Sequence, residues 1–184
     1  MKNAQIIHHY WTSPCGILDL ASIGEELVMC DWAEGWHRAA ALYRLTRLTK
    51  LPMVEDASSV IDLAQVQLAE YFDQRRQVFT VPLRLIGSEF QTRVWHALTK
   101  IPYGKTISYG EIAREVNSPK AVRAVGGAVG ANLFFHHHPV SPRRRREWFS
   151  ITGYGGGYAA KRHLLALELG LSADELPFSR GVKE

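Results

Sequence analysis

Cysteine is the residue type in this chain best suited to act as a nucleophile at neutral pH, because a thiolate attacks carbon and sulfur centres readily. The chain has two cysteines, Cys15 and Cys30, and neither has a histidine or a basic residue fixed beside it in the sequence. Such neighbours are what lower the pKa of a reactive thiol. Two cysteines at this spacing also indicate neither a disulfide framework nor a metal site. We therefore interpret both as small buried or surface thiols.

Two short helices across a tight turn are predicted between Ser108 and Gly130. Ser108 and Glu111 have the spacing of a capping box, which opens the first helix. We expect Ser118 to cap the second helix and Pro119 to occupy its first position. This arrangement is typical of a helix-turn-helix, although any pair of packed helices gives the same pattern.

Basic side chains near the start of that second helix could contact nucleic-acid phosphates. Lys120 and Arg123 lie there, where a helix-turn-helix faces DNA. Residues 1–90 carry 8 Lys and Arg against 11 Asp and Glu, whereas residues 91–184 carry 14 against 7. The basic second half favours a polyanionic partner, nucleic acid first. The alternative is that much of the excess comes from one solvated run, Arg143–Arg146.

The first third of the chain predicts an antiparallel sheet that would position these groups. Three apolar or aromatic runs, Ile6–Trp11, Ile17–Ser22 and Leu27–Trp32, are separated by turn residues. A helix is predicted over Ser59–Phe72, opened by a capping box of Ser59 with Asp62.

The second half predicts helices that are bounded by more frequent capping and turn residues. Ser88 and Gln91 form a capping box before an apolar helical stripe. A last helix is predicted from Tyr158 to Leu169, ending at Gly170. We find no internal repeat and no low-complexity linker.

Composition excludes several classes of protein. The chain has 184 residues, of which 46% are apolar and 22% charged, as in an ordinary globular protein of one or two domains. Its apolar runs are far below the roughly 20 residues of a membrane span. The start lacks a signal-peptide core, so we expect a cytoplasmic protein without a membrane partner.

The motifs of the second half closely resemble those of the O6-alkylguanine-DNA alkyltransferases, also called methylated-DNA–protein-cysteine methyltransferases. The resemblance covers residues 87–132 and 152–170, and the N-terminal third is compatible but weakly diagnostic. The matching motifs, in order, are Phe90-Gln91-x-x-Val94-Trp95-x-Ala97-Leu98, Ile101-Pro102-Tyr103-Gly104, Ser108-Tyr109-Gly110-Glu111-Ile112-Ala113, Ala121-Val122-Arg123-Ala124-Val125-Gly126, Asn132, Thr152-Gly153-Tyr154-x-Gly156-Gly157 and Lys161-x-x-Leu164-Leu165-x-Leu167-Glu168.

The resemblance implies a single-turnover repair reaction on DNA. Members of the family hold damaged DNA on a helix-turn-helix, flip the alkylated guanine into a pocket and move the alkyl group onto a cysteine that is not regenerated. A neighbouring His and a Glu lower the pKa of the thiol, a Tyr donates a proton to the leaving guanine, and an Arg fills the gap in the base stack.

These roles are carried over by motif onto this chain. Tyr109 would be the proton donor, Asn132 would orient the sulfur loop, and Glu168 would end the relay. The expected DNA contacts are Arg123 as the intercalating side chain, Lys120, Ser118 and Tyr109. The expected substrate pocket comprises Tyr154, Gly156 and Trp95. The alternatives are that Tyr109 covers a helix start, that Arg123 is a solvated charge and that Glu168 is an exposed helix residue.

The family's Pro-Cys-His-Arg signature is absent where it should follow Asn132 by about seven residues. There is no cysteine after Cys30, and residues 133–151 contain His136–His138 and Arg143–Arg146 instead. Three adjacent histidines do not point one way on a helix or strand, so they do not predict a metal site. As written, the chain lacks the acceptor and is predicted to be inactive.

A shifted reading frame would explain the altered segment. Codons CCC GTG TCA CCG CGT for Pro139-Val140-Ser141-Pro142-Arg143, read one base later, encode Pro-Cys-His-Arg. The cysteine would then be encoded across Val140 and Ser141. His136–His138, as CAT CAT CAT, would become isoleucines in that frame. We hypothesise that about Leu133 to Ile151 is out of frame and that the frame is restored near Thr152.

Together these observations predict an α/β protein in two parts. Residues 1–86 would form a three-stranded antiparallel sheet with a helix, resembling a ribonuclease-H-like domain. Residues 87–175 would form a mainly helical domain with a winged-helix-like helix-turn-helix, and 176–184 a tail. We expect a monomer that binds double-stranded DNA carrying O6-alkylguanine and needs no cofactor and no metal. A non-catalytic alkyltransferase-like protein and a plain helix-turn-helix DNA binder are the alternatives.

Overall fold

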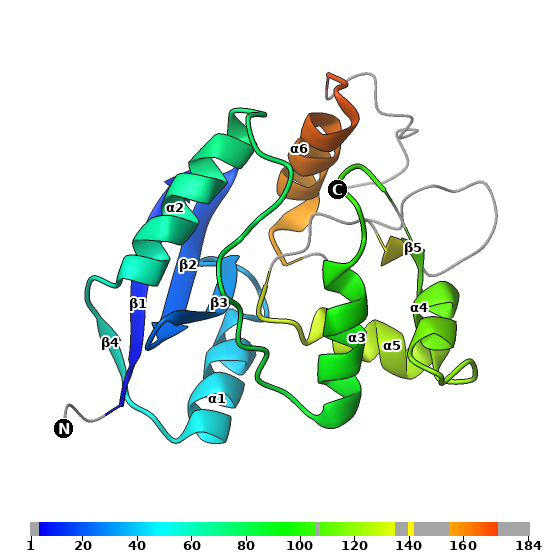
Figure 1. Ribbon diagram of the computed structural model, residues 1–184, viewed down its shortest axis with the longest axis horizontal. Helices are drawn as coiled ribbons and strands as arrows, with labels where there is room; N and C mark the ends of the chain where they lie inside the picture. The colour runs from blue at the N-terminus through cyan, green and yellow to red at the C-terminus, as the bar shows by residue number, and fades with distance from the viewer. Residues whose placement is uncertain (1–3, 106, 135–139, 142–154, 173–184) are drawn as a thin grey trace.

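The mixed α/β fold predicted from the sequence is confirmed by a computed structural model (Figure 1). The structure describes residues 4–105, 107–134, 140–141 and 155–172. Its elements, in chain order, are β1 (Ile6–Ser13), β2 (Gly16–Ile23), β3 (Glu26–Trp32), α1 (Arg38–Thr49), β4 (Met53–Glu55), α2 (Ser59–Phe72), α3 (Glu89–Thr99), β5 (Ile107–Ser108), α4 (Tyr109–Glu115), α5 (Val122–Gly130), β6 (Val140–Ser141) and α6 (Gly157–Leu169).

The N-terminal sheet has the order β3-β2-β1-β4. The predicted antiparallel pairing of β1, β2 and β3 is confirmed. A fourth strand corrects the prediction of three, because β4 pairs parallel with β1, with Ile6 opposite Met53. This strand has three residues, which is too short for alternation in the sequence to reveal it.

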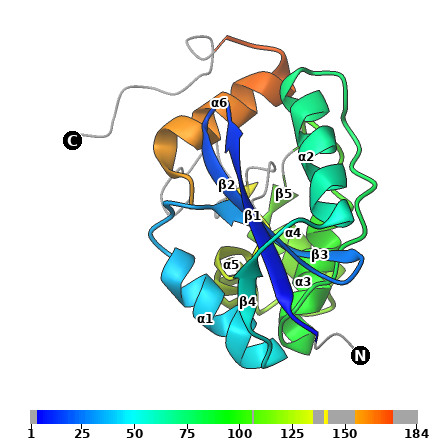
Figure 2. The ribbon, with the colours of Figure 1, turned by 90° about the vertical axis from the view of Figure 1, so that its left-hand side faces the viewer.

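The two faces of the sheet carry different side chains, because successive residues of a strand point to opposite sides. Leu18 and Leu20 belong to one core cluster with residues of α2 and α6, including Leu68 and Leu164. Residues of the other face form a second cluster with α1, built from Ile6, Ala21, Val28, Met29, Ala41 and Leu45. Figure 2 shows α1 and α2 on opposite sides of the sheet.

Two buried aspartates interrupt the apolar pattern of the strands. Asp19 of β2 lies opposite Asp31 of β3 in the register. Asp19 accepts from Arg38 at 2.5 Å and lies 3.1 Å from the ring of His8. Asp31 bonds the ring of His37 at 2.8 Å. Buried charges require such partners, so this network fixes the start of α1, a helix that the sequence analysis did not predict, against the sheet.

The helical half is built from α3, α4 and α5 around an apolar core. Both capping boxes predicted here are present, and the hydroxyls of Ser88 and Ser108 accept the N–H groups of Gln91 and Glu111. Asn117 takes the left-handed conformation (φ 56°) in the turn between α4 and α5, as a short polar residue can.

One predicted helix start and one predicted cap are wrong, although α2 spans Ser59–Phe72 as predicted. The helix α5 begins at Val122 rather than Pro119, and Ser118 forms the preceding turn, its carbonyl accepting from the N–H of Ala121 at 2.8 Å. The N-cap of α2 is Ser58, and Ser59 instead donates its hydroxyl to Glu25 at 3.2 Å. Ser59 thus finds its partner in the turn between β2 and β3, whereas the carbonyl and the hydroxyl of Ser118 bond residues of its own turn.

Helix α6 ends at Gly170, which adopts the left-handed conformation (φ 64°) that the sequence predicted there. Its residues Ala160 and Leu164 pack into the core formed by the sheet and α2, so the two halves share buried surface. Within the described part of the chain, no helix combines the length and the apolar character that a membrane crossing requires.

Candidate functional site

The aromatic ring of Tyr109 packs against the second helix of the helix-turn-helix. Tyr109 is the first residue of α4, and a Cβ placed on Gly126 of α5 would lie 3.3 Å from its ring. Glycine therefore allows the closest approach of α5 to the phenol. Burial raises the pKa of the Tyr109 phenol, which keeps it protonated and able to donate a proton at neutral pH.

The predicted DNA-contacting side chains lie at the turn and the first turn of α5. Lys120 and Arg123 are exposed. Ser118 is half-buried, and its hydroxyl donates a hydrogen bond to the carbonyl of Val116 at 3.4 Å. The two cations can therefore reach a phosphate backbone, while Ser118 has a role in shaping the turn.

Backbone pairing brings the segment after Asn132 beside Tyr109. The strand β6, Val140–Ser141, pairs parallel with β5, and Ser141 lies opposite Ser108, the residue before Tyr109 (Figure 1). The backbone of Val140 and Ser141 therefore lies beside the start of α4.

Asn132 directs the chain from the end of α5 toward the sheet. It is buried, and its side-chain carbonyl accepts the N–H of Phe134 at 3.0 Å. The carbonyl of Leu133 then accepts the N–H of Cys30 at 2.8 Å. Arg44 of α1 donates to the carbonyl of Ala131 at 2.5 Å. Asn132 thus acts at the junction between the two halves.

Glu168 is a buried carboxyl held by groups from both halves of the molecule. The hydroxyl of Tyr71, on α2, donates to one oxygen at 3.0 Å, and the N–H of Gly104 donates to the other at 3.1 Å. Burial raises the pKa of Glu168 to about 7, and the two hydrogen bonds oppose that rise. The group can consequently gain or lose a proton near neutral pH, as a relay residue must. The alternative that Glu168 is an exposed helix residue is therefore wrong.

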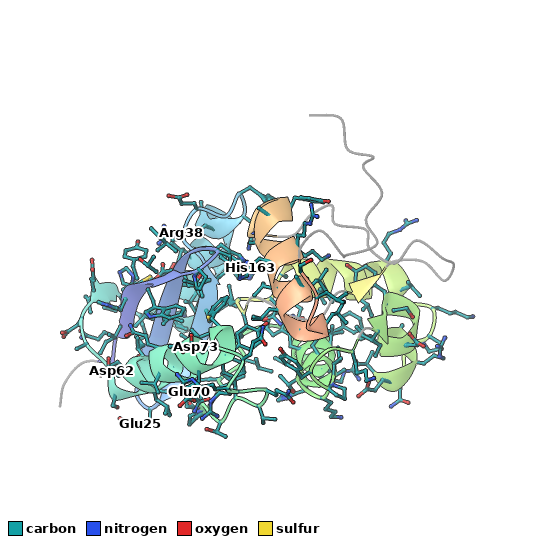
Figure 3. The ribbon with its side chains drawn as sticks, turned by 90° about the horizontal axis from the view of Figure 1, so that it is seen from above. Glu25, Arg38, Asp62, Glu70, Asp73 and His163 are labelled. Atoms are coloured by element: carbon teal, nitrogen blue, oxygen red, sulfur yellow. The ribbon has the colours of Figure 1, made fainter. Side chains whose placement is uncertain are left out.

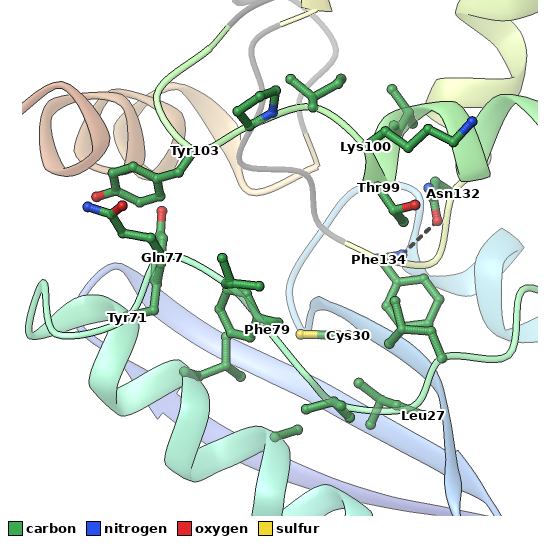
Figure 4. Close-up of a pocket in the computed structure, with 18 of the residues that line it drawn as sticks. Leu27, Cys30, Tyr71, Gln77, Phe79, Thr99, Lys100, Tyr103, Asn132 and Phe134 are labelled. Atoms are coloured by element: carbon green, nitrogen blue, oxygen red, sulfur yellow. Dashed lines mark hydrogen bonds between the residues drawn. The ribbon is translucent and has the colours of Figure 1, made fainter.

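A cavity of about 400 Å³ lies between the sheet, α2 and the end of α3 (Figure 4). Asn132 and Glu168 are in its wall, and so is Cys30. Burial and the nearby Asp31 and Asp19 raise the pKa of the Cys30 thiol well above its usual value. The thiol is therefore protonated and a poor nucleophile.

The structure separates the predicted site residues into two groups. Tyr109, Lys120 and Arg123 belong to the helix-turn-helix, whereas Asn132 and Glu168 line the cavity. Asn132 follows α5 by two residues, whereas Glu168 lies on α6, beyond residues 135–139 and 142–154, which the structure does not describe.

Two of the three predicted pocket residues have packing roles in the described structure. Trp95 is buried in the core of the helical half, where its indole N–H donates to the carbonyl of Ala128 at 2.7 Å. Gly156 lies so close to the indole of Trp32 that a Cβ would approach one ring carbon to 2.3 Å. Tyr154 lies outside the described residues.

Tyr71 is the site residue that sequence reasoning missed. Its ring is buried on α2. The hydrogen bond to Glu168 joins residues 97 positions apart, so spacing along the chain carries no signal for it. The described residues bring together no group of three His, Cys, Asp or Glu side chains that could hold a metal ion.

Comparison with known proteins gives a consistent picture. Residues 89–170 match the family model described as 6-O-methylguanine DNA methyltransferase, DNA binding domain. The chain is 34% identical to a methylated-DNA–protein-cysteine methyltransferase of Haemophilus influenzae over 174 residues, covering 89% of this chain and 86% of the relative. It is 41% identical to one of Mycobacterium tuberculosis over 167 residues, covering 87% and 92%.

Solved structures match over the same extent. The crystal structure of Mycobacterium tuberculosis OGT in complex with DNA superposes with a TM-score of 0.71 and 38% sequence identity, covering 89% of this chain and 93% of that one. Figure 3 labels Glu25 in the turn after β2, Arg38 on α1, Asp62, Glu70 and Asp73 on or next to α2, and His163 on α6, all away from α4 and α5.

Proposed function

This chain belongs to the family of methylated-DNA–protein-cysteine methyltransferases, and from that premise we propose that it binds double-stranded DNA carrying O6-alkylguanine but cannot accept the alkyl group as written. The coarser function is that of a DNA-binding repair protein of this family. The finer proposal concerns which residues act and what the altered segment removes.

The proposed DNA interface is the helix-turn-helix of α4 and α5. Lys120 would contact a phosphate, and Arg123 would enter the base stack where the alkylated guanine is flipped out. Lys120 lies in the turn just before α5 and Arg123 in its first turn, and both side chains are exposed. The family model that matches residues 89–170, which include both helices, is described as a DNA binding domain and supports this choice of surface.

The observation that carries the proposal is the pairing of β5 with β6. It holds the backbone of Val140 and Ser141 beside Ser108, immediately before Tyr109. In a chain with cysteine at this position, the thiolate would attack the alkyl carbon and the bond from that carbon to O6 of guanine would break. The electron pair of that bond would pass to the base, which would take a proton from Tyr109.

Neither of the two cysteines of this chain is suited to replace that acceptor. Cys30 lines the cavity between the halves, and Cys15 lies in the turn between β1 and β2. Burial raises the pKa of both thiols, so the reactive thiolate is disfavoured at each. We propose that the shifted frame over residues 133–151 removed the acceptor while the surrounding scaffold persisted. The nucleotide sequence under residues 130–153 tests this directly, and other codons in an unbroken frame would contradict it.

The remaining assignments are part of the same proposal. Asn132 would orient the segment that follows it, and Glu168 would end a proton relay in the parent protein. Gly156 and Tyr154 would shape the alkyl-group side of the pocket, and the protein would act as a monomer. The buried Asn132–Phe134 bond and the raised pKa of Glu168 support the first two roles.

Fluorescence anisotropy with two duplexes, one containing O6-methylguanine and one unmodified, tests the binding. We expect the chain to bind the alkylated duplex more tightly, and Arg123→Ala to reduce that preference about tenfold. Lys120→Ala should lower the affinity for both duplexes equally and reduce by about one the slope of log affinity against log salt concentration. Arg47→Ala, an exposed arginine on α1, is the matched control and should bind as the parent does. Equal affinity for the two duplexes would favour a plain DNA binder, and an unchanged Arg123→Ala variant would contradict the proposed interface.

A further inference from the structure

Helix α5, which carries Arg123 of the proposed DNA interface, has a sequence that favours a helix only weakly. Three of its nine residues are glycine, which is among the poorest helix-forming residues. Its N-cap residue, Ala121, makes no side-chain capping bond, and α5 has no acid in its first turn and no base in its last. Such groups satisfy helix ends and complement the helix dipole. We therefore expect the order of α5 to depend on partners outside it.

Two side chains from other helices bond the C-terminal end of α5. The indole N–H of Trp95, on α3, donates to the carbonyl of Ala128 at 2.7 Å. The guanidinium of Arg44, on α1, donates to the carbonyl of Ala131, the C-cap residue, at 2.5 Å. Trp95 belongs to the same half of the molecule as α5, whereas Arg44 comes from the N-terminal half, and Figure 2 shows α1 beside α5.

Arg44 supplies the cation that the last turn of α5 lacks. The last carbonyls of a helix have no partner within the helix. A cationic donor at this end satisfies one of them and complements the negative end of the helix dipole. Arg44 is half-buried, and Asp31 of β3 lies near enough to favour its charged form. The charge is therefore retained where the side chain meets α5.

We propose that Arg44 is a positioning residue for DNA binding, because it orders the C-terminal end of α5 and thereby fixes how this helix presents Arg123 to DNA. The inference rests on the proposed function, since it concerns the same interface. It deepens that function by making the affinity for DNA depend on a contact from the N-terminal half. Arg44 acts through α5 and makes no contact with DNA.

Hydrogen–deuterium exchange on the free protein tests the ordering of α5. Arg44→Met removes the donor but keeps a long side chain. We expect the protection of the amides of residues 127–131 to fall at least about tenfold more than the protection of α1 and the sheet. Arg44→Lys keeps a cationic donor and should retain most of the protection. Arg47→Met, at an exposed arginine of the same helix, is the matched control and should leave the protection unchanged.

Fluorescence anisotropy with the alkylated and the unmodified duplex tests the consequence for DNA. Arg44→Met should lower the affinity for both duplexes at least about fivefold. The slope of log affinity against log salt concentration should stay as in the parent, whereas loss of a direct phosphate contact would reduce it by about one. Arg44→Lys should bind nearly as the parent does, and Arg47→Met should bind as the parent does.

Four results would overturn the proposal. They are unchanged protection of α5 in Arg44→Met, a loss of protection spread evenly over α1, the sheet and α5, an unchanged affinity for DNA, and a salt slope reduced by about one. A parent protein that binds neither duplex would instead contradict the proposed function. The exchange data on the free protein would then decide by themselves whether Arg44 orders α5.

Discussion

At the scale of single residues, Glu168 shows how the fold shifts the pKa of a buried carboxyl. The carboxyl is 7% exposed and is hydrogen-bonded by Tyr71 and by the backbone of Gly104. Desolvation outweighs both bonds, so its pKa is raised to about 7. A group that titrates near the working pH suits a relay, but its burial lowers stability at higher pH.

The first prediction concerns this stability cost. Because the folded-state pKa of about 7 exceeds the unfolded value of 4.5, unfolding releases a proton between these values. The free energy of unfolding should therefore fall by up to about 3 kcal/mol as pH rises from 4.5 to 7. Glu168→Gln should remove most of this fall, measured by urea denaturation at several pH values.

His37 contributes a smaller loss of the same sign, which stays in the Glu168→Gln variant. Its hydrogen bond to Asp31 raises the pKa of its ring above 6.5, so its stabilisation is present below that pH and is lost as pH rises through the folded-state pKa. Parallel pH profiles for the parent and Glu168→Gln would contradict the account given for Glu168.

A second prediction separates two glycines. Gly156→Ala should lower the free energy of unfolding by about 1–3 kcal/mol, because its Cβ would overlap the indole of the buried Trp32. Gly127→Ala is the control, since a Cβ there has no neighbour within 4 Å and a helical alanine replaces a glycine. It should stabilise the chain by about 0.5–1 kcal/mol. Thermal unfolding measures both, and equal shifts would contradict the packing described for Gly156.

At the scale of elements, side-chain caps define where two helices of the DNA-binding half begin. The boxes Ser88–Gln91 and Ser108–Glu111 each satisfy backbone N–H groups in both directions. The second box fixes the orientation of Tyr109, which directly follows its N-cap residue. The placement of Tyr109, the proposed proton donor, therefore depends on a local motif.

The third prediction tests these caps. Ser88→Ala and Ser108→Ala should each cost about 1 kcal/mol of stability, because an orphan N–H group loses its acceptor. Ser59→Ala should cost less, because the hydroxyl of Ser59 bonds an exposed Glu25 and caps no helix. Denaturant midpoints compare the three, and a larger loss at Ser59 than at Ser108 would contradict the assigned caps.

The sequence predicted elements whose signals are local and missed features that depend on distant partners. The capping boxes, the strands of β1–β3 and the glycine stop after α6 each arise within a few residues, and the structure confirms them. The start of α5, the strand β4 and the bond from Tyr71 to Glu168 depend on segments brought together by folding. Spacing along the chain carries no information on such contacts.

At the scale of the whole molecule, the two halves are tied together by buried contacts rather than by a linker alone. Helix α6 packs on α2 and the sheet, Tyr71 bonds Glu168, and Arg44 bonds the carbonyl of Ala131. The scaffold that presents α4 and α5 is therefore continuous with the N-terminal sheet. Residues 133–151 lie outside these two helices, so our proposal predicts that binding of DNA can persist where transfer of an alkyl group is lost.

The most direct test of this account is a transfer measurement on the whole chain. The purified protein is incubated with a duplex containing O6-methylguanine and analysed by intact-protein mass spectrometry, with anisotropy confirming that it binds the duplex. As a positive control, residues 133–151 recoded in the offset frame should gain one methyl group per chain. We predict that the chain as written binds the duplex and gains none. A methyl group gained by the chain as written would contradict the claim that the family scaffold survives here without its acceptor.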